Sequence, residues 1–255
     1  MTNETGPQTL PLLPLSSGVV LPGMVFTLAL ESEEALTAGE AAGSVGGRLV
    51  LVPRLDGRYS PVGVIAEIVE MGELPGGGRA AVIRGLERGM IGTGLPGTGR
   101  ALWVQVEPVE RAAATPEAQQ LAREYRAVLE NILLQRGARA MAERLREVTE
   151  PSDIADLAGY SPDLSLEQKI QVLETLELAE RLRLVLGWAR ETLADLALRE
   201  QIKSSVEEGM EKTQREFLLR RQLEAIRKEL GQLNPTDEDA PDDYRKAIEG
   251  RELPE

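Results

Sequence analysis

Short apolar runs alternate with turn-forming residues over the first part of the chain, from Leu10 to about Arg111. Runs of this length, bounded by glycine and proline, are typical of β-strands joined by tight turns. One stretch, Glu33–Ala42, has instead the spacing of a helix. Several short strands, one helix and glycine-rich turns together predict a small, partly closed β-barrel. The predicted strands are Leu10–Leu15, Val25–Leu30, Arg48–Pro53, Val62–Val69, Ala80–Arg84 and Leu102–Val109.

Near Thr115 the apolar positions change to a period of about 3.6 residues, which is the period of an amphipathic helix. Thr115 is a suitable N-cap, and Pro116 fits the first turn of a helix. Ser165 followed by Gln168 has the pattern of a capping box. Because their apolar faces need a shared core, the helices in this part of the chain are predicted to form a bundle. They are Pro116–Gln135, Ala138–Val148, Ser165–Leu173 and Glu177–Arg199.

The stretch from about Leu193 to Leu233 contains no proline and one glycine, Gly209, and predicts a single long helix. At about 1.5 Å per residue its length is on the order of 60 Å, more than a bundle requires, so we expect it to project. Its apolar residues form two stripes on nearly opposite faces. An ordinary amphipathic helix with irregular spacing would explain this, and so would a helix that packs on its own domain with one stripe and on a partner with the other. The first stripe is Val206, Met210, Thr213 and Phe217, and the second is Leu219, Leu223, Ile226, Leu230 and Leu233.

After Gly231 the helical pattern ends. The prolines and acidic residues of 234–243 predict a flexible linker, and residues 244–250 begin a new helical pattern shortly before the sequence stops. We therefore expect a piece of a longer protein. The predicted strands followed by helices indicate an α+β fold. The expected parts are a barrel lobe at 1–114, a helical bundle lobe at 115–192, the long helix at 193–233 and the acidic linker at 234–255.

The composition limits the chemistry that this chain can perform. Of its 255 residues 42% are apolar, enough for a core, but none is cysteine or histidine. Thiol catalysis, Ser-His-Asp triads and histidine-ligated zinc are therefore excluded within the chain. The net charge is −13 and basic residues do not cluster, which argues against nucleic-acid binding. Because we find neither a signal peptide nor an apolar stretch long enough to span a membrane, we expect a cytoplasmic protein without membrane contact.

One cofactor motif matches the sequence, but its context is wrong. The residues Gly92-Thr93-Gly94-Leu95-Pro96-Gly97 have the spacing of a dinucleotide-binding loop, which must open a helix. Here the following residues predict a strand, so we interpret the motif as a hairpin loop. No glycine precedes a lysine, which excludes a P-loop within this sequence, and the acids of 237–243 lack the pattern of a calcium loop. We expect no catalytic, cofactor-binding or metal-binding residue, and no hydrolysis of ATP or peptides by this chain.

Three stretches, in order along the chain, resemble the amino-terminal region of Lon proteases. The first is Leu10-Pro11-Leu12-Leu13-Pro14-Leu15 with Val19-Val20-Leu21-Pro22-Gly23-Met24. The second is Gly63-Val64-Ile65-Ala66 with Arg84-Gly85-Leu86-Glu87-Arg88. The third is the helical stretch Arg215–Gly231, which is long and specific. The resemblance covers nearly the whole chain, and Tyr244-Arg245 and Leu253-Pro254 look like the beginning of the segment that leads into the ATPase.

The resemblance implies a PUA-like barrel, a helical lobe and a long helix. It also implies a complete enzyme that is a hexamer, unfolds proteins with an AAA+ ATPase and cleaves them with a Ser-Lys dyad. Both of those parts, with ATP and magnesium, are expected beyond Glu255. By the same analogy this chain gathers unfolded or damaged proteins and helps to assemble the ring of subunits.

Three other functions are compatible with parts of the sequence. The first is a stand-alone Lon-like interaction domain without an ATPase, against which the long helix argues. The second is an RNA-binding protein, because other PUA-like barrels bind RNA, but the acidic charge argues against it. The third, an independent enzyme, has the least support because no motif carries it.

Two sets of residues are candidates for contact with other proteins. Pro22 and Met24 lie in a turn where apolar side chains are hard to bury, and methionine suits promiscuous contacts. With Leu74, Met90 and Ile91 they are expected to bind exposed apolar segments of substrates, the alternative being that they pack inward. The second stripe of the long helix is expected to be an assembly surface, since exposed Leu and Ile side chains need a partner.

Overall fold

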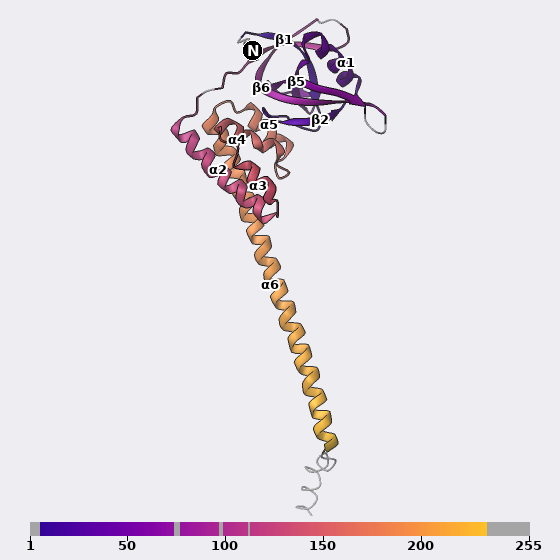
Figure 1. The fold of residues 1–255 in the computed structure, drawn as a ribbon, viewed down its shortest axis with the longest axis vertical. Coiled ribbons are helices and arrows are strands. Elements are labelled where there is room, and N and C mark those ends of the chain that lie inside the picture. The colour runs from indigo at the N-terminus through magenta and orange to yellow at the C-terminus, as the bar shows by residue number, and fades with distance from the viewer. Residues whose placement is uncertain (1–5, 74–76, 97–98, 112, 234–255) are drawn as a thin grey trace, which may run out of the picture. The chain divides into compact units, whose positions relative to one another are not determined.

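The computed structural model describes residues 6–73, 77–96, 99–111 and 113–233, without the side chains of residues 211 and 231–233. The chain forms two compact units, Met1–Leu196 and Ala197–Glu255. The first unit contains the β-strands of the described residues and the shorter helices, and the second contains the C-terminal part of the longest helix (Figure 1).

Five strands of the first unit close into a barrel. Their order is β1 (Gln8–Leu15), β7 (Leu102–Pro108), β6 (Arg79–Leu95), β5 (Val62–Glu73) and β3 (Arg48–Leu55). β3 then pairs in parallel with β1, whereas the other pairs in the ring are antiparallel. The barrel is therefore closed, where the sequence predicted partial closure. The parallel pair has the long connection that such pairs require, and this connection carries α1 (Glu33–Ala42).

Two short strands lie outside this ring. β2 (Val25–Ala29) pairs with β6, and β4 (Arg58–Tyr59), which the sequence did not predict, pairs with the end of β3. The short helix η1 (Gly43–Val45) connects α1 to β3. The predicted bounds of α1 are those observed, and the Ser32 hydroxyl caps it by accepting the Ala35 N–H at 3.0 Å.

Alternate residues of the barrel strands enter two hydrophobic clusters. Along β3, Leu49 and Leu51 belong to the larger cluster, which continues into the helices, while Val50 and Val52 belong to a smaller one. Both sets are fully buried. Because successive side chains of a strand point to opposite faces, burial on both faces explains why this stretch is a continuous apolar run.

β5 and β6 are much longer than the sequence predicted. Residues of the glycine-rich segment, including Gly92 and Gly94, continue β6 to Leu95, with a register shift against β7 between Ile91 and Gly94. The described residues around this segment lead into β7, and no helix begins among them. The glycines therefore belong largely to a strand and not to the hairpin loop that the sequence predicted, and in the strand they allow close approach of the backbones.

Gly85, in the middle of β6, is a second position where only glycine fits. A Cβ atom there would lie 2.8 Å from the backbone oxygen of Leu21. We expect Gly85→Ala to lower the free energy of unfolding by about 1–3 kcal/mol, because backbone cannot yield as a flexible side chain can. Gly43→Ala is the matched control: it has a helical φ of −56° and open space around it, so it should be neutral or slightly stabilising. Urea unfolding of both variants measures the difference, and equal stabilities would contradict this account.

The helices that follow pack on the larger cluster. α2 (Pro116–Gln135) has the predicted bounds and its Thr115 cap, and the capping box of Ser165 and Gln168 begins α5 (Leu166–Glu174). The predicted helix Ala138–Val148 is shorter, as α3 (Arg139–Leu145). A missed helix, α4 (Pro151–Asp156), follows it and continues into η2 (Leu157–Tyr160). A separate helix begins at Pro151 because proline lacks an N–H and fits the first turn of a helix.

α6 is one helix of 56 residues, Leu178–Leu233, where the sequence predicted a bundle helix and a separate long helix. Neither Gly187 nor Gly209 interrupts it. Its first turns lie in the first unit, where Leu182 and Val185 are buried in the larger cluster. The remainder, from Ala197, belongs to the second unit. Among the helices that the structure describes, none combines the length and apolar character needed to cross a membrane.

Candidate functional site

A buried ion pair joins the barrel to the helices of the first unit. The guanidinium of Arg88 on β6 donates to both carboxylate oxygens of Asp156 on α4, at 2.9 Å and 2.7 Å. It also donates to the backbone oxygens of Leu173 and Val172 at the end of α5, at 3.0 Å and 3.2 Å. The side chains of Arg88 and Asp156 are only 6% and 1% exposed. This bidentate pair fixes one strand against two helices.

A second arginine, Arg181 on α6, shares the same carboxylate. Its Nε lies 3.6 Å from Oδ1 of Asp156, and its terminal nitrogens donate to the Thr175 backbone oxygen and the Ser152 hydroxyl. Burial, and then the neighbouring charge of Arg88, lowers the pKa of Arg181 to about 10. Arg181 therefore stays charged at neutral pH, and the Asp156 carboxylate is shared by two buried guanidinium groups. This cluster holds β6 and the helices α4, α5 and α6 together.

The turn at Pro22-Gly23-Met24 packs against η2 rather than facing solvent. The sulfur of Met24 accepts the Leu21 N–H at 3.2 Å and lies so close to Gly159 that a Cβ atom there would overlap it. Beside it the Tyr160 hydroxyl accepts the Val25 N–H at 3.1 Å. The first motif of the Lon resemblance is thus part of the contact between the barrel and the helices.

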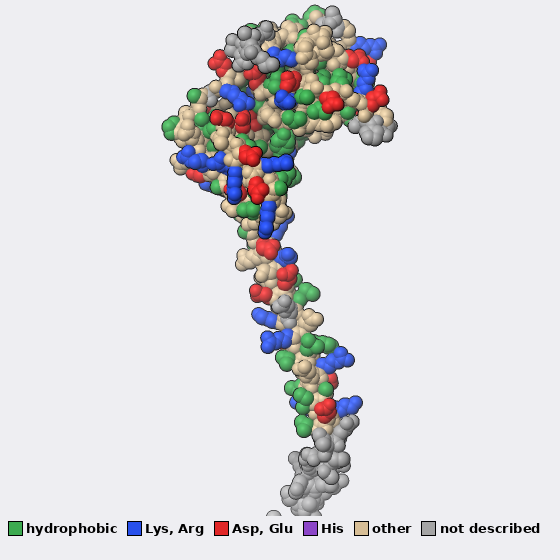
Figure 2. Space-filling model, viewed as in Figure 1, with side chains coloured by type: hydrophobic (Ala, Val, Ile, Leu, Met, Phe, Trp, Pro, Cys, Tyr) green, Lys and Arg blue, Asp and Glu red, His purple; other side chains and the backbone are tan. Residues whose placement is uncertain are grey.

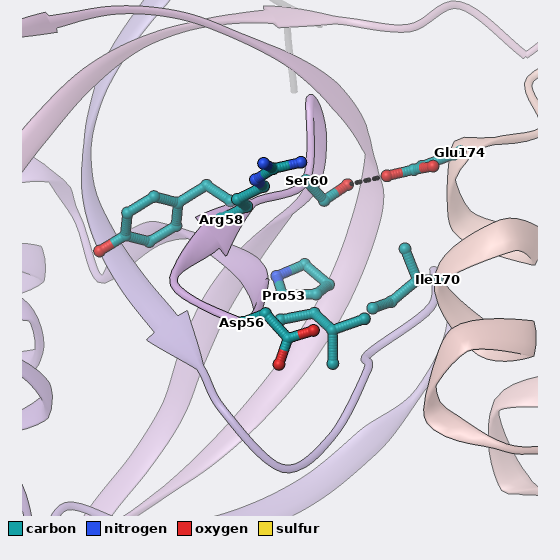
Figure 3. Close-up of a pocket in the computed structure, with 8 residues that line it drawn as sticks. Pro53, Asp56, Arg58, Ser60, Ile170 and Glu174 are labelled. Carbon is teal, nitrogen blue, oxygen red and sulfur yellow. Dashed lines mark hydrogen bonds between the residues drawn. The ribbon is translucent and has the colours of Figure 1, made fainter.

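A pocket of about 480 Å³ lies between the β3–β4 turn and α5 (Figure 3). Its apolar lining comes from Pro53, Leu55 and Ile170, and its polar lining includes Arg58 and Glu174. Ser60 Oγ lies 2.9 Å from a carboxylate oxygen of Glu174, as the dashed line shows. Ser60 is itself buried and also contacts the backbone of Val62, so its hydroxyl is committed to structural hydrogen bonds. The pocket lining therefore combines apolar side chains with a hydrogen-bonded serine and carboxylate.

The expected substrate-binding residues do not form one exposed patch. Pro22 and Met24 are buried, Met24 with only 8% of its surface exposed, so the prediction that they face solvent is wrong. The physical reason is that η2, which the sequence pattern did not predict, covers this turn. Met90 is 38% exposed and Ile91 is half-buried against the smaller cluster, while Leu74 lies outside the described residues.

Other apolar side chains of the first unit are exposed, and none of them was predicted as a contact residue. They lie on β2, β5 and β7 and on the helices, where strand or helix periodicity alone does not show which face is covered. They include Val25, Val69, Met71, Leu102, Met141 and Tyr160.

The second unit shows both predicted stripes of α6 in solvent. Of the assembly candidates, Leu219, Leu223, Ile226 and Leu230 are at least half exposed, and the side chain of Leu233 lies outside the described part. Val206, Met210 and Phe217 of the first stripe are exposed to a similar degree. Figure 2 shows these hydrophobic side chains alternating with charged ones along the helix. Exposure therefore does not distinguish the two stripes.

The buried pair was not among the predicted site residues. Arg88 lies within a motif of the Lon resemblance, but the pattern gave it no role, and Asp156 was not singled out. A single acid inside the apolar run Ile154-Ala155-Asp156-Leu157-Ala158 is a signal that could have identified a buried pair, because an isolated carboxylate is rarely buried without a partner. No group of three or more acidic side chains that could hold a metal ion occurs among the described residues.

Comparison with known proteins agrees with this architecture. Residues 9–191 match the family model of the ATP-dependent protease La (LON) substrate-binding domain. The chain is 47% identical over 248 residues to a Lon protease of Salinispora arenicola, covering 96% of this chain and 31% of that protein. It is 44% identical to a Lon protease of Mycolicibacterium smegmatis, covering 97% and 32%.

A solved structure described as the N-terminal domain of Mycobacterium avium complex Lon protease superposes with a TM-score of 0.69. It is 42% identical, and the match covers 72% of this chain and 98% of that one. The chain thus spans about a third of the length of the curated relatives it matches. It belongs to the family of Lon protease substrate-binding domains.

Proposed function

We propose that this chain is the substrate-recognition and assembly region of an ATP-dependent Lon-type serine protease that degrades unfolded or damaged proteins in the cytoplasm. The observation that carries the proposal is the match of residues 9–191 to the Lon substrate-binding family. The ATPase, the Ser-Lys dyad and the sites for ATP and magnesium would lie in the part of the protein that this chain does not span. Its partners would be protein substrates and the other subunits of a hexamer.

The chemistry of the first unit supports binding rather than catalysis. Its buried charged groups, Arg88, Asp156 and Arg181, are engaged with one another, and the hydroxyl of the pocket serine, Ser60, is hydrogen-bonded to the backbone of Val62. The exposed apolar side chains are dispersed over strands and helices. Several small apolar contacts of this kind suit weak, multivalent recognition of apolar segments, which a folded protein buries and an unfolded one exposes.

A stand-alone interaction domain is the alternative proposal. The second unit favours the Lon-type assembly, because two stripes of large apolar side chains on one solvent-exposed helix need partners that a free-standing domain would not supply. Reading the gene beyond Glu255 decides between the two: a following P-loop supports the protease, and a stop codon supports the stand-alone domain.

Binding of unfolded protein tests the proposed function directly. We expect the immobilised chain to retain reduced, carboxymethylated α-lactalbumin, which cannot refold, and to release the native form of the same protein. Dissociation constants from a concentration series should be weak and nearly insensitive to salt, since apolar contacts dominate. Equal retention of the native and unfolded forms would contradict recognition of exposed apolar segments.

A further inference from the structure

Only one of the two edges of β2 is hydrogen-bonded to another strand. It pairs with β6 alone, with Val25 opposite Arg84 and Ala29 opposite Ala80. Just outside this register Gly85 donates to the Met24 oxygen at 2.9 Å and Leu30 donates to the Arg79 oxygen at 2.8 Å. In an antiparallel pair the bonded residues alternate. Phe26 and Leu28 therefore bond to β6, and Val25, Thr27 and Ala29 direct their backbone groups away from it.

The outward edge of β2 is open over most of its length. The Val25 N–H is occupied by the hydroxyl of Tyr160, which confirms the direction deduced from the register. Within the described residues, the backbone N–H and oxygen of Thr27 and Ala29 have no hydrogen-bond partner on this side. The side chains of Val25 and Thr27 are exposed as well. Figure 1 shows β2 at the rim of the barrel, with no strand on its outer side.

This edge lacks the features that usually protect an exposed strand. Natural proteins place charges, prolines or bulges on such edges because unpaired backbone groups otherwise recruit another chain. The β2 sequence Val25-Phe26-Thr27-Leu28-Ala29 contains no charged residue and no proline, and its pairing with β6 has no bulge. The other strand outside the ring, β4, is only two residues long and carries Arg58. Of the two strands outside the ring, β2 is therefore the one with an open, neutral edge, at Thr27 and Ala29.

We propose that the outer edge of β2 pairs with an extended segment of an unfolded polypeptide and adds it to the sheet as a further strand. The inference rests on the proposed function and names the mode of recognition. The complementary groups are backbone N–H and C=O groups in an extended chain, which unfolded proteins expose and folded proteins bond internally. Because backbone groups carry the contact, the edge accepts many sequences, with apolar side chains favoured beside Val25.

The Tyr160 hydroxyl sets the end of this edge. It bonds the first outward N–H, so a paired segment would meet the free groups of Thr27 and Ala29 and stop at Val25. Tyr160→Phe frees one more donor and is expected to tighten binding about 2–10-fold, the effect of one hydrogen bond.

A peptide probe isolates the backbone contribution. The probe is a fluorescein-labelled peptide of about eight residues, alternating valine and threonine, long enough to cover a five-residue strand. A second peptide has the same side chains but N-methyl groups at alternate positions, which removes the N–H groups along one of its edges. A third peptide is methylated along the other edge, because either edge of the peptide could pair with β2. Anisotropy titration of the whole chain should show binding of the first peptide and loss of binding, at least about 10-fold, when the pairing edge is methylated.

Protein variants test the same contact from the other side. Thr27→Pro removes the outward N–H without touching a bond to β6, and proline is tolerated on an edge strand in that orientation. It should weaken peptide binding about 3–10-fold or more. Thr27→Val retains the backbone N–H and changes only the side chain, so it distinguishes the contribution of the backbone to binding from that of the side chain. Met141→Gln, on α3, is a second control because it removes an exposed apolar side chain elsewhere. Circular dichroism and unfolding curves show whether Thr27→Pro has kept the fold; if it has not, the methylated peptides alone decide.

The outcomes separate the failure of this inference from the failure of the proposed function. If carboxymethylated α-lactalbumin binds but edge methylation and Thr27→Pro have no effect, strand pairing is overturned and the proposed function stands. If neither unfolded protein nor peptide binds, both are overturned. If the parent forms dimers in sedimentation that Thr27→Pro abolishes, and no peptide binds, the occupant of the edge is a second copy and the inference is overturned.

Discussion

Replacing Asp156 by asparagine is expected to lower the free energy of unfolding by about 3–5 kcal/mol, a larger loss than most single substitutions cause. The carboxylate is almost fully buried and compensates both Arg88 and Arg181. Asparagine keeps the shape but removes the charge, so two guanidinium groups would remain buried without a counter-ion. Burial already lowers the pKa of Arg181 to about 10, so the charge of this guanidinium is held in an unfavourable environment.

Asp153 provides a matched control on the same helix. It pairs with Arg111 at 2.9 Å, but both side chains are about half exposed, at 41% and 51%. Asp153→Asn should therefore change the free energy of unfolding by only about 0–1 kcal/mol. Urea unfolding followed by circular dichroism, at low and high salt, compares the two variants. A loss for Asp156→Asn no greater than that for Asp153→Asn would show that the buried pair does not hold the barrel to the helices.

Replacing Met24 by alanine should cost about 2–5 kcal/mol, because a large buried side chain is removed from the larger core cluster. Adding a methyl group at Gly159, on the opposite side of the same contact, should cost about 1–3 kcal/mol through overlap with the Met24 sulfur. Met141→Ala is the control, because that methionine is exposed and its loss should change stability by no more than about 0.5 kcal/mol.

The double variant tests whether Met24 and Gly159 act through one contact. Alanine at position 24 leaves room for the new methyl group, so the combined loss should be smaller than the sum by about 1 kcal/mol or more. Additive losses would contradict direct packing. The same variants bear on function: if Met24→Ala remains folded and binds unfolded protein like the parent, the methionine has only a structural role.

Local chemistry was enough to predict the elements whose signals lie within a few residues. The bounds of α1 and α2, the Thr115 cap and the capping box at Ser165 follow from side chains that bond to their own backbone, and they are confirmed. The motifs also led to the Lon family, because they are spread in order over nearly the whole chain. The absence of cysteine and histidine excludes whole classes of catalytic site from this chain by composition alone.

The tertiary structure decided what depends on contacts between distant residues. Closure of the barrel is a pairing of β1 with β3, and nothing within either strand encodes it. Burial of Met24 depends on η2, more than a hundred residues away in sequence, and only the fold brings Gly159 to it. The same applies to Arg88 and Asp156, whose residue types are ordinary until packing removes water from both. The open edge of β2 could not be predicted either, because the sequence of a strand shows which residues are extended but not how many other strands pair with it.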